Sequence, residues 1–500
     1  MALVGRILKV VLFAAFVALA SVFGVRAIDS MRGGPLQPWH TDAPDDATAQ
    51  QIETMDWAQW RVAENRVFQQ VETEIVGKLS PDQQVPQNRY WSGSSVHAPS
   101  LGTDWNRSFT LAPEGPAVGS AVMLHGMTDA PYSLRHVARH YQQMGYHVVA
   151  IRLPGHGTVP AGLEQARAED WQAATRLAVR EASRRAPGLP LHIVGYSNGG
   201  ALAVAHALDA TTNASLGMPA RLVLLSPMIG LTPFARFAGM AGWPAILPAF
   251  HKAAWLDIIP EYNPFKYNSF PVNAGAQAHR LTVLLTEKLN AAEQENRMSR
   301  MPPVLGFISV VDSTVNAPAV RSDLFDKLPA NGSELILIDI NRNAYVGPLI
   351  RPSALARLEQ FLPIAPRAYR TTIIASGEPG AQTSTLRIFE PGSITETRGT
   401  LPIPYPRDFY SLSHIALPFP LTDGLYGTRP DPADNHGVSL GTLALRGENG
   451  VLSVGMGTFN RVSANPFFPW FLDRLGSLPA PENAAGAPAG APAASATAQP

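Results

Sequence analysis

Cysteine is absent from this 500-residue sequence, and neither sign of charge is in excess. The absence of cysteine excludes disulfides, iron–sulfur clusters, thiolate metal ligands and a cysteine nucleophile. Lysine plus arginine and aspartate plus glutamate each number 39, which argues against a nucleic-acid-binding protein, because such proteins normally carry a basic excess. Charged residues make up only 16% of the chain, but 46% of its residues are hydrophobic, which is enough for a large buried core.

The N-terminus has the pattern of a membrane-targeting segment. Arg6 and Lys9 precede an uncharged stretch from Val10 to Val25, so residues 1–26 predict a signal peptide or a membrane anchor. We prefer a retained anchor, because the small residues Ala18–Ala20 lie inside the apolar stretch rather than after it. In a bacterium this orientation would anchor the chain in the inner membrane with its catalytic part in the periplasm. The alternative is a periplasmic or secreted protein whose signal has been cleaved.

Composition divides the rest of the chain into segments. Residues 27–54 have the composition of a polar linker. Residues 55–87 predict an amphipathic helical region that packs on the main body. Its apolar stripe consists of Trp60, Ala63, Val67, Val71 and Ile75. Residues 479–500 contain ten alanines and five prolines and predict a disordered tail.

Apolar, β-rich runs alternate with helical patterns between residues 88 and 341. The expected strands are Val118–Leu124, Tyr146–Leu153, Leu191–Tyr196, Arg221–Leu225, Val304–Val311 and Glu334–Ile340. The expected helices are Ser133–Gly145, Glu169–Arg185 and Asn198–Ala210. Nearly continuous apolar strands separated by helices predict an α/β fold with a mostly parallel sheet covered on both faces.

Two segments interrupt this alternation, so we divide the core into three parts. The parts are residues 88–231, 302–341 and 411–478. Residues 232–301, between the first two, are rich in aromatic residues and predict a cap; they include Phe234, Phe237, Met240, Trp243, Phe250 and Trp255. Residues 342–410 form a second insertion, with β-like runs at Arg370–Ala375 and Thr385–Phe389.

The strongest chemical signal is a serine between glycines. An apolar strand enters Gly195-Tyr196-Ser197-Asn198-Gly199, and a helical pattern of small residues leaves it. A sharp strand-to-helix turn strains the serine backbone, and the flanking Gly195 and Gly199 remove the Cβ clashes that such a turn would cause. This context predicts that Ser197 is an exposed nucleophile.

The loop after an earlier strand predicts donors for an oxyanion. The strand that ends at Leu124 continues into His125-Gly126-Met127, and hydrolases of this geometry use such a loop together with the N–H after the nucleophile. We assign the two donors to the backbone N–H groups of Met127 and Asn198. His125 is interpreted as a structural residue that orders the loop.

By these motifs the chain resembles the α/β-hydrolase superfamily over roughly residues 100–425. The monoacylglycerol-lipase, lysophospholipase and carboxylesterase-like subgroups are the nearest in appearance. Their Pro-Gly-His-Gly turn looks like Pro154-Gly155-His156-Gly157 in this sequence, where we interpret His156 as structural. The resemblance implies an α/β-hydrolase fold, an inserted cap and a nucleophile, acid and base in that order along the chain.

The resemblance also suggests the acid and the base. The family places its acid after the seventh strand, where Asp312-Ser313-Thr314-Val315 looks like the family's D-x-T-V; Asp339, in the next strand, is the competitor. After Asp312 the only histidines are His414 and His436. His414 lies in a Ser-x-x-His context similar to that of family bases and is preferred. Its separation of 414 − 312 = 102 residues from the acid departs from the family pattern.

These residues imply a serine hydrolase with the catalytic residues Ser197, Asp312 and His414. We expect it to cleave carboxylic esters, either lipid-like or generic acyl esters, through an acyl-enzyme, with a small-molecule ester as its substrate. This chemistry needs no metal and no organic cofactor. Two alternatives stay open: an amidase or prolyl-aminopeptidase-like hydrolase, and a membrane-tethered, non-catalytic interaction module on a hydrolase fold.

Overall fold

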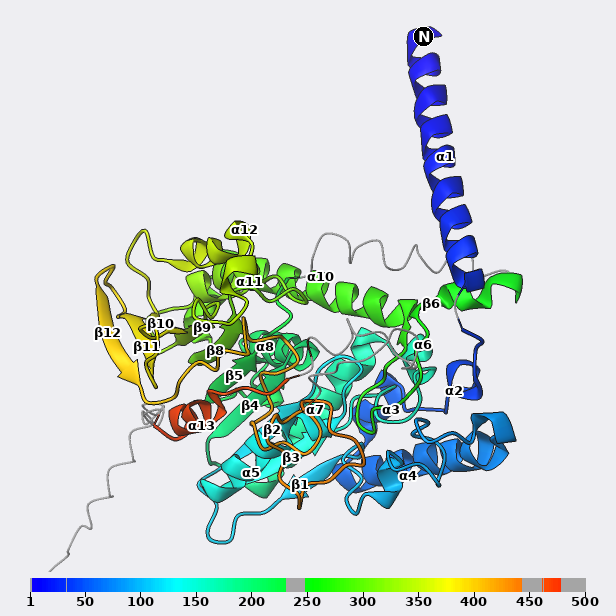
Figure 1. The fold of residues 1–500 in the computed structure, drawn as a ribbon, viewed down its shortest axis with the longest axis horizontal. Coiled ribbons are helices and arrows are strands. Elements are labelled where there is room, and N and C mark those ends of the chain that lie inside the picture. Colours follow the sequence, from blue (N-terminus) through cyan, green and yellow to red (C-terminus); the bar gives the residue numbers. More distant parts are fainter. Residues whose placement is uncertain (1, 33, 231–247, 443–460, 462, 478–500) are drawn as a thin grey trace, which may run out of the picture.

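The computed structural model describes residues 2–32, 34–230, 248–442, 461 and 463–477. A ten-stranded sheet forms its centre (Figure 1). The strands are β1 (Phe109–Leu111), β2 (Gly119–Leu124), β3 (Tyr146–Ile151), β4 (Leu191–Tyr196), β5 (Arg221–Leu225), β8 (Val304–Ser309), β9 (Glu334–Ile338), β10 (Arg370–Ser376), β11 (Ser384–Phe389) and β12 (Glu396–Leu401). Their order is β1-β3-β2-β4-β5-β8-β9-β10-β11-β12. All neighbours from β3 to β10 are parallel, whereas β1, β11 and β12 pair antiparallel.

Helices cover both faces of this sheet (Figure 1). The longer ones around it are α5 (Arg135–Gln143), α7 (Ala168–Arg185), α8 (Asn198–Ala210), α10 (Val272–Gln294) and α13 (Phe468–Gly476). Successive residues of a strand point to opposite faces, so Val122 and Leu124 join the core cluster that contains α7, α8 and α10, while Ala121 and Met123 join the cluster with α5 and α13. Burial on both faces explains why the strands are continuously apolar. The predicted fold class is confirmed.

The sheet reverses its order of winding between β2 and β4. After β2 the chain proceeds to β3 on one side, and β4 then lies on the other side of β2. The connections that follow these two neighbours therefore diverge, which opens a crevice at the carboxyl edge of the sheet, where ligands bind in open α/β folds. The segments after Leu124, Tyr196 and Ser309 all begin at this edge.

Residues 370–401 belong to the central sheet. β10 pairs in parallel with β9, and β11 and β12 continue the sheet to its far edge. The segment that we predicted as an insertion at residues 342–410 therefore extends the core. The two β-like runs had been recognised, but their pairing with β9 depends on contacts between segments that are distant in the sequence.

The second half of the predicted cap is a core helix. In α10, Leu281, Leu285 and Leu289 are buried in the cluster shared with α8. The two short strands β6 (Trp255–Asp257) and β7 (Phe270–Pro271) precede it. The remaining residues predicted for the cap, among them Phe234, Phe237, Met240 and Trp243, lie outside the described residues, as does the predicted tail at 479–500.

Residues 34–54, predicted as part of a linker, dock on the body. They contain α2 (Pro38–Thr41) and α3 (Ala49–Thr54), and α3 packs on α7. Ile52 is fully buried, and the Asp170 carboxylate accepts a hydrogen bond of 2.7 Å from the Ala49 N–H. Although the segment is polar on average, a few of its side chains, such as Ile52, are buried against the body and hold it in place.

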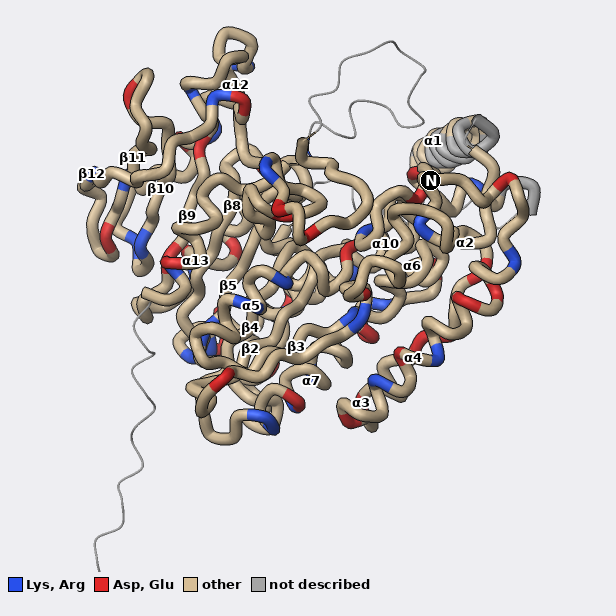
Figure 2. The backbone as a smooth tube through the Cα atoms, turned by 60° about the horizontal axis from the view of Figure 1, so that its bottom comes forward, with Lys and Arg blue, Asp and Glu red and all other residues tan. Residues whose placement is uncertain are grey.

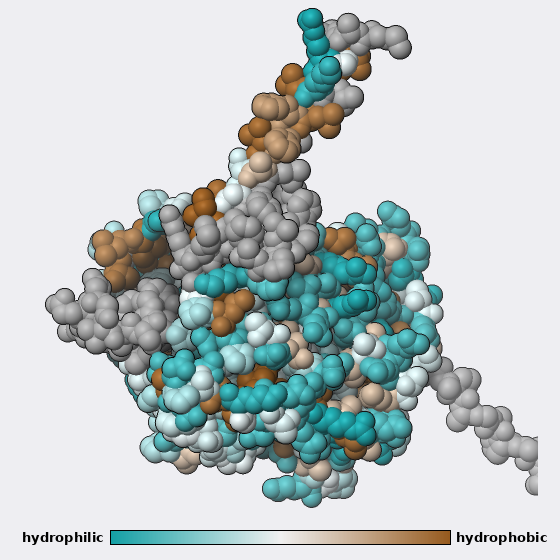
Figure 3. Space-filling model, turned by 90° about the vertical axis from the view of Figure 1, so that its right-hand side faces the viewer, coloured by the Kyte–Doolittle hydropathy of each residue, from teal (hydrophilic) through white to brown (hydrophobic). Residues whose placement is uncertain are grey.

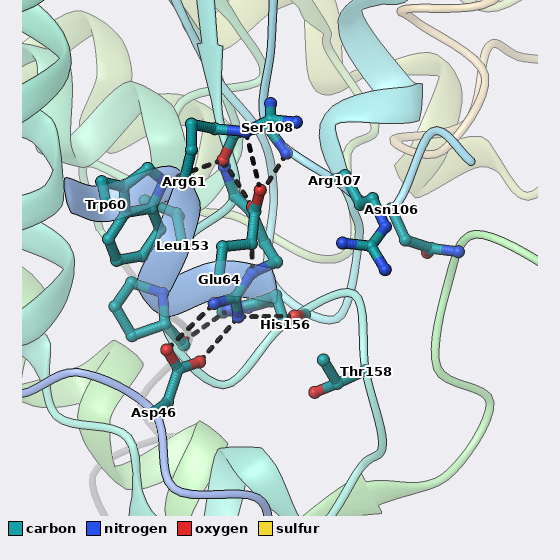
Figure 4. A network of polar contacts seen from close by, with 12 residues as sticks. Asp46, Trp60, Arg61, Glu64, Asn106, Arg107, Ser108, Leu153, His156 and Thr158 are labelled. Atoms are coloured by element: carbon teal, nitrogen blue, oxygen red, sulfur yellow. Dashed lines mark hydrogen bonds and ion pairs between the residues drawn. The ribbon is translucent and has the colours of Figure 1, made fainter. Parts of the chain in front are cut away.

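Helix α4 (Trp57–Glu74) forms as predicted and carries charges of both signs along its length (Figure 2). Trp60, Val67 and Val71 are buried as expected, but Ala63 is only partly buried. Glu64 is buried in its place, which the stripe of apolar residues did not predict. Its carboxylate joins a polar network between α4 and the body (Figure 4).

Helix α1 (Ala2–Arg32) runs out from the body, and many of its described side chains are exposed and apolar (Figures 1 and 3). In the part of the chain that the structure describes, no helix combines the length and the hydropathy of a membrane span. The anchor proposed for residues 1–26 stays a prediction.

Candidate active site

Ser197 occupies a strained turn at the carboxyl edge of the sheet. Its φ of 55° and ψ of −114° lie in a region that non-glycine residues rarely adopt, as predicted for the strand-to-helix turn between β4 and α8. The Ser197 N–H donates a 2.9 Å hydrogen bond to Leu225 O, which ties the turn to β5. The side chain is thereby held at the first turn of α8, whose aligned dipoles favour negative charge there. Ser197 is only 7% exposed, so the prediction of an exposed nucleophile was wrong on this point: the surrounding segments cover the serine.

The glycines around Ser197 are needed for close backbone contacts. A Cβ on Gly195 would lie 2.4 Å from Gly199 O, and a Cβ on Gly199 would lie 2.0 Å from Leu124 O. Both distances are far shorter than any real contact, so a side chain at either position would force the backbone apart. The geometry gives the physical reason for the pattern recognised in the sequence.

Two buried histidines join the loop after β2 to the turn after β3. His125 Nδ1 donates to Gly126 O at 2.9 Å, and Nε2 accepts the Leu153 N–H at 3.0 Å. The His156 ring packs edge-on against His125, with ring centroids 5.0 Å apart. Both imidazoles thus order the loop that carries Met127, in line with the structural interpretation of the two residues.

The backbone N–H groups of Met127 and Asn198 lie on the two segments that flank Ser197. Among the described residues, neither N–H donates a hydrogen bond to another group. A Cβ on Gly126, next to Met127, would lie 3.2 Å from Ser197 Cβ, so the loop passes close to the serine. This arrangement makes both N–H groups available to a negatively charged oxygen.

His414 and Asp312 are in direct contact although 102 residues separate them. His414 Nδ1 and Asp312 Oδ2 lie 2.8 Å apart, and both side chains are almost completely buried. The His414 ring also packs against Tyr196, the neighbour of Ser197, with ring centroids 5.4 Å apart. No hydrogen bond joins Ser197 Oγ to His414 among the described residues; such bonds are often long without substrate and tighten when substrate binds.

Asp312 is held in its charged form. Burial by itself would raise the pKa of its carboxyl, but the His414 imidazole and the N–H groups of Val315 and Thr314 lower the pKa below its ordinary value. An ionised Asp312 that accepts from Nδ1 leaves Nε2 of His414 as the nitrogen able to accept a proton.

The two competing residues have other partners. His436 Nε2 lies 3.1 Å from Asp434 Oδ1, and its ring packs on Tyr132 and Phe265. Asp434 in turn accepts from the buried Arg135, which also binds Asp423 at 2.6 Å. This network holds together the segment that follows His414.

Asp339 is the second competitor, and neither His414 nor His436 is among the described partners of its carboxylate. Its described side-chain partner is Arg342, at 3.4 Å, and burial raises the pKa of the Asp339 carboxyl.

Sequence reasoning missed two residues that hold the site. Tyr196 donates its hydroxyl hydrogen bond to His414 O at 3.3 Å, so the residue between Gly195 and Ser197 also fixes the segment of the histidine. Lys266 Nζ lies 2.9 Å from Asp129 Oδ1 and 2.9 Å from Thr128 Oγ1, which ties the segment before α10 to the loop after Met127. Tyr196 occupies a variable position of the motif around Ser197 and Lys266 belongs to no motif, so only the folded chain brings these partners together.

Residues 115–339 match the family model described as serine aminopeptidase, S33 (Hydrolase_4). Combined with the strand order and the turn at Ser197, this match decides the fold. The chain has the α/β-hydrolase fold. The match also supports a hydrolase, and its span includes Met127, Ser197 and Asp312 but ends before His414.

Related hydrolases match about half of this chain. The thermostable monoacylglycerol lipase of Bacillus sp. (strain H-257) is 26% identical over 235 residues, which are 47% of this chain and 84% of the lipase. The structure of a metagenome-derived lipolytic enzyme (LipS and LipT) has a TM-score of 0.38 and 23% identity and covers 47% of this chain and 88% of its own. The structure of a soluble variant of the Saccharomyces cerevisiae monoglyceride lipase has a TM-score of 0.35 and 16% identity, and the match covers 46% of this chain and 81% of the lipase chain.

The buried histidines predict an acid-sensitive hydrolase. Burial lowers the pKa of His156 to about 3 and lowers that of His125 well below its ordinary value. The unfolded chain takes up these protons near pH ~6.5, so each group should lower the free energy of unfolding by up to about 1.4 kcal/mol per pH unit below that value. Urea unfolding across this range measures the slope. His156→Asn should reduce the slope; an unchanged slope would contradict the assignment.

Proposed function

We propose that this hydrolase cleaves carboxylic esters, with Ser197 as nucleophile, His414 as general base and Asp312 as the acid that orients it. The observation that carries the proposal is the 2.8 Å contact of His414 Nδ1 with Asp312 Oδ2, formed beside the turn that presents Ser197. A carboxylate, an imidazole and a strained serine at one sheet edge constitute the chemistry of acyl transfer.

Each residue would have one task in the reaction. His414 Nε2 takes the proton of Ser197 Oγ as the oxygen attacks the ester carbonyl, and the imidazolium is stabilised by Asp312. The N–H groups of Met127 and Asn198 donate to the oxyanion of the tetrahedral intermediate, each contributing about 3 kcal/mol. His414 then gives its proton to the leaving alcohol. Water, deprotonated by His414, hydrolyses the acyl-enzyme and regenerates Ser197.

The surroundings of His414 favour an ester with a sizeable apolar group. A cavity of about 940 Å³ adjoins Asp312 and His414, and its wall includes Ile340, Val346 and Phe409. Polar residues, among them Arg351, Asp408 and Arg461, complete the wall, so the cavity offers both apolar and polar groups to a small molecule. The related lipase of Bacillus is named for its action on monoacylglycerols. A lipid-like acyl ester is therefore the substrate class that we propose.

The family description favours a second candidate, an aminopeptidase. Such an enzyme needs an unpaired carboxylate near the nucleophile to bind the substrate ammonium. Asp129 is close to the site, since a Cβ on Gly126 would be 2.8 Å from its Oδ2 and 3.2 Å from Ser197 Cβ. However, Asp129 already pairs with Lys266 at 2.9 Å. This pairing favours the esterase over the aminopeptidase.

A substrate panel with a covalent probe tests the proposal. Purified protein should hydrolyse p-nitrophenyl esters of several chain lengths much faster than aminoacyl amides, and a fluorophosphonate should label it. The label should be absent from Ser197→Ala, whereas Ser226→Ala, at another strained serine, should still be labelled. Turnover of amides alone would favour the aminopeptidase. If the protein shows no turnover and no labelling, the result would favour a non-catalytic module.

A further inference from the structure

The segment between β9 and β10 exposes large apolar side chains. Leu349 is 81% exposed, Tyr345 70% and Val346 42%, within six residues. We call residues 345–350 the apolar loop. Single exposed apolar residues are common on soluble proteins, but a cluster of them at one protruding loop is typical of an interaction site.

The base of the apolar loop is fixed. Asn341 N donates to Tyr410 O at 3.0 Å, and its side-chain amide donates to Phe409 O at 2.9 Å. The Arg342 guanidinium donates to Leu355 O at 3.1 Å, and Tyr345 N donates to Arg407 O at 2.8 Å. The exposed side chains are thus held outward by an ordered backbone.

Positive charge is in excess around the apolar loop. Residues 341–359 contain Arg342, Arg351 and Arg357 and one acidic residue, Glu359. Asp408 lines the same cavity as Leu349. Arg351 and Arg357 are exposed. Arginines beside exposed leucine and tyrosine match the two layers of an anionic lipid surface, because the guanidinium groups meet the head groups while the apolar side chains enter the acyl boundary. A neutral apolar partner would not explain the arginines.

The location of the apolar loop agrees with a lipid surface. α12 (Pro352–Leu355), which directly follows the loop, lies at the same upper edge of the molecule from which α1 projects (Figure 1). The exposed apolar side chains of α1 therefore extend from the same side of the body. Val346 and Leu349 also line the cavity that reaches His414 and Asp312.

We propose that the apolar loop docks on an anionic lipid surface and holds the mouth of the cavity beside His414 against it. The contact inserts Leu349, Val346 and Tyr345 into the acyl boundary, while Arg351 and Arg357 bind anionic head groups. This binding surface is separate from the predicted N-terminal anchor and from the residues proposed for catalysis, so it is testable without any assay of hydrolysis.

Because the chain has no cysteine, single-cysteine labelling tests the proposal in the full-length protein. Leu349→Cys carries a polarity-sensitive fluorophore, which should shift to the blue and brighten several-fold with phosphatidylcholine vesicles that contain phosphatidylglycerol. Ala214→Cys is the matched control, because it is exposed beyond the far end of α8 and should not respond. Phe13→Cys, on α1, reports separately on the predicted anchor. Adding Arg351→Gln and Arg357→Gln should weaken the vesicle affinity that the Leu349 label reports by about an order of magnitude.

The outcomes separate the possible occupants of the loop. A Leu349 label that remains in water with the anionic vesicles overturns the proposal, whether or not the Phe13 label enters the lipid. A blue shift without lipid that grows with protein concentration shows that a second copy covers the loop, which also overturns it. An equal response at Ala214 shows non-specific adsorption and counts against it too.

Discussion

His414→Ala should lower kcat for a p-nitrophenyl ester by about 10³–10⁶-fold, whereas His436→Gln should stay within about tenfold of the unmodified enzyme. Ser197 is a poor nucleophile unless a base removes its proton, and His414 is the imidazole that contacts Asp312 beside it. His436 instead binds Asp434 within a buried network. Steady-state kinetics on the three proteins measure the difference.

Folding controls separate chemistry from stability in this comparison. His436 packs on Tyr132 and Phe265, so its variant should melt at a lower temperature while retaining activity below that transition. Asp312→Asn supplies a matched test of the pair, because it leaves the shape intact but favours the wrong imidazole tautomer, and should cost about 10⁴-fold in kcat. A fully folded His436→Gln protein without activity would contradict the assignment of His414.

The part of the site that follows local backbone rules was predictable from the sequence. The turn at Ser197 needs glycine on both sides, and β4 and α8 begin and end at the predicted residues. The loop after Leu124 is equally local, since it continues a strand whose apolar pattern is plain. Asp312 was placed by resemblance, from the short motif after β8. Such features depend on a few adjacent residues, so they can be recognised from a single sequence.

Features that depend on contacts between distant segments were not predictable in the same way. β10 pairs with β9, with Thr371 opposite Leu335. The residues of β10 alone would also be compatible with a strand in a separate insertion. Glutamate is usually exposed to solvent. Glu64 is buried because Arg152 and Ser108, on the body of the protein, bind its carboxylate. Lys266 gives no sequence signal at all, because its partners lie about 140 residues away.

The charge network that contains Glu64 carries the second large effect that we expect. Arg152 follows β3 and is fully buried, with its guanidinium 2.6 Å from Asp46 and 3.3 Å from Glu64. Ser108 Oγ donates to Glu64 at 2.7 Å and accepts from Arg152 N at 2.8 Å. Figure 4 shows that Asp46 and Glu64 reach this point from two separate segments. One arginine thus joins the N-terminal segments to the body.

Arg152→Met should lower the free energy of unfolding by about 3–5 kcal/mol. Removing one partner of a buried ion pair leaves the opposite charge poorly compensated. Here Asp46 and Glu64 would both lose the guanidinium, and among the described residues Glu64 would keep only the longer ion pair with Arg61, at 3.5 Å. Urea unfolding measures the loss. Arg184→Ala is the matched control: its side chain is 70% exposed, and its partner Glu181 keeps a second ion pair with Arg185, so the expected loss of stability is small.

A triple variant separates lost charge pairing from lost packing. Arg152→Met combined with Glu64→Gln and Asp46→Asn removes the uncompensated charges and should recover part of the stability, because neutral amides cost less to bury than unpaired carboxylates. The Leu153 N–H, next to Arg152, donates to His125, which orders the loop that carries Met127. We therefore expect Arg152→Met to lower kcat as well. Equal losses in Arg152→Met and Arg184→Ala would show that the N-terminal segments dock without this network.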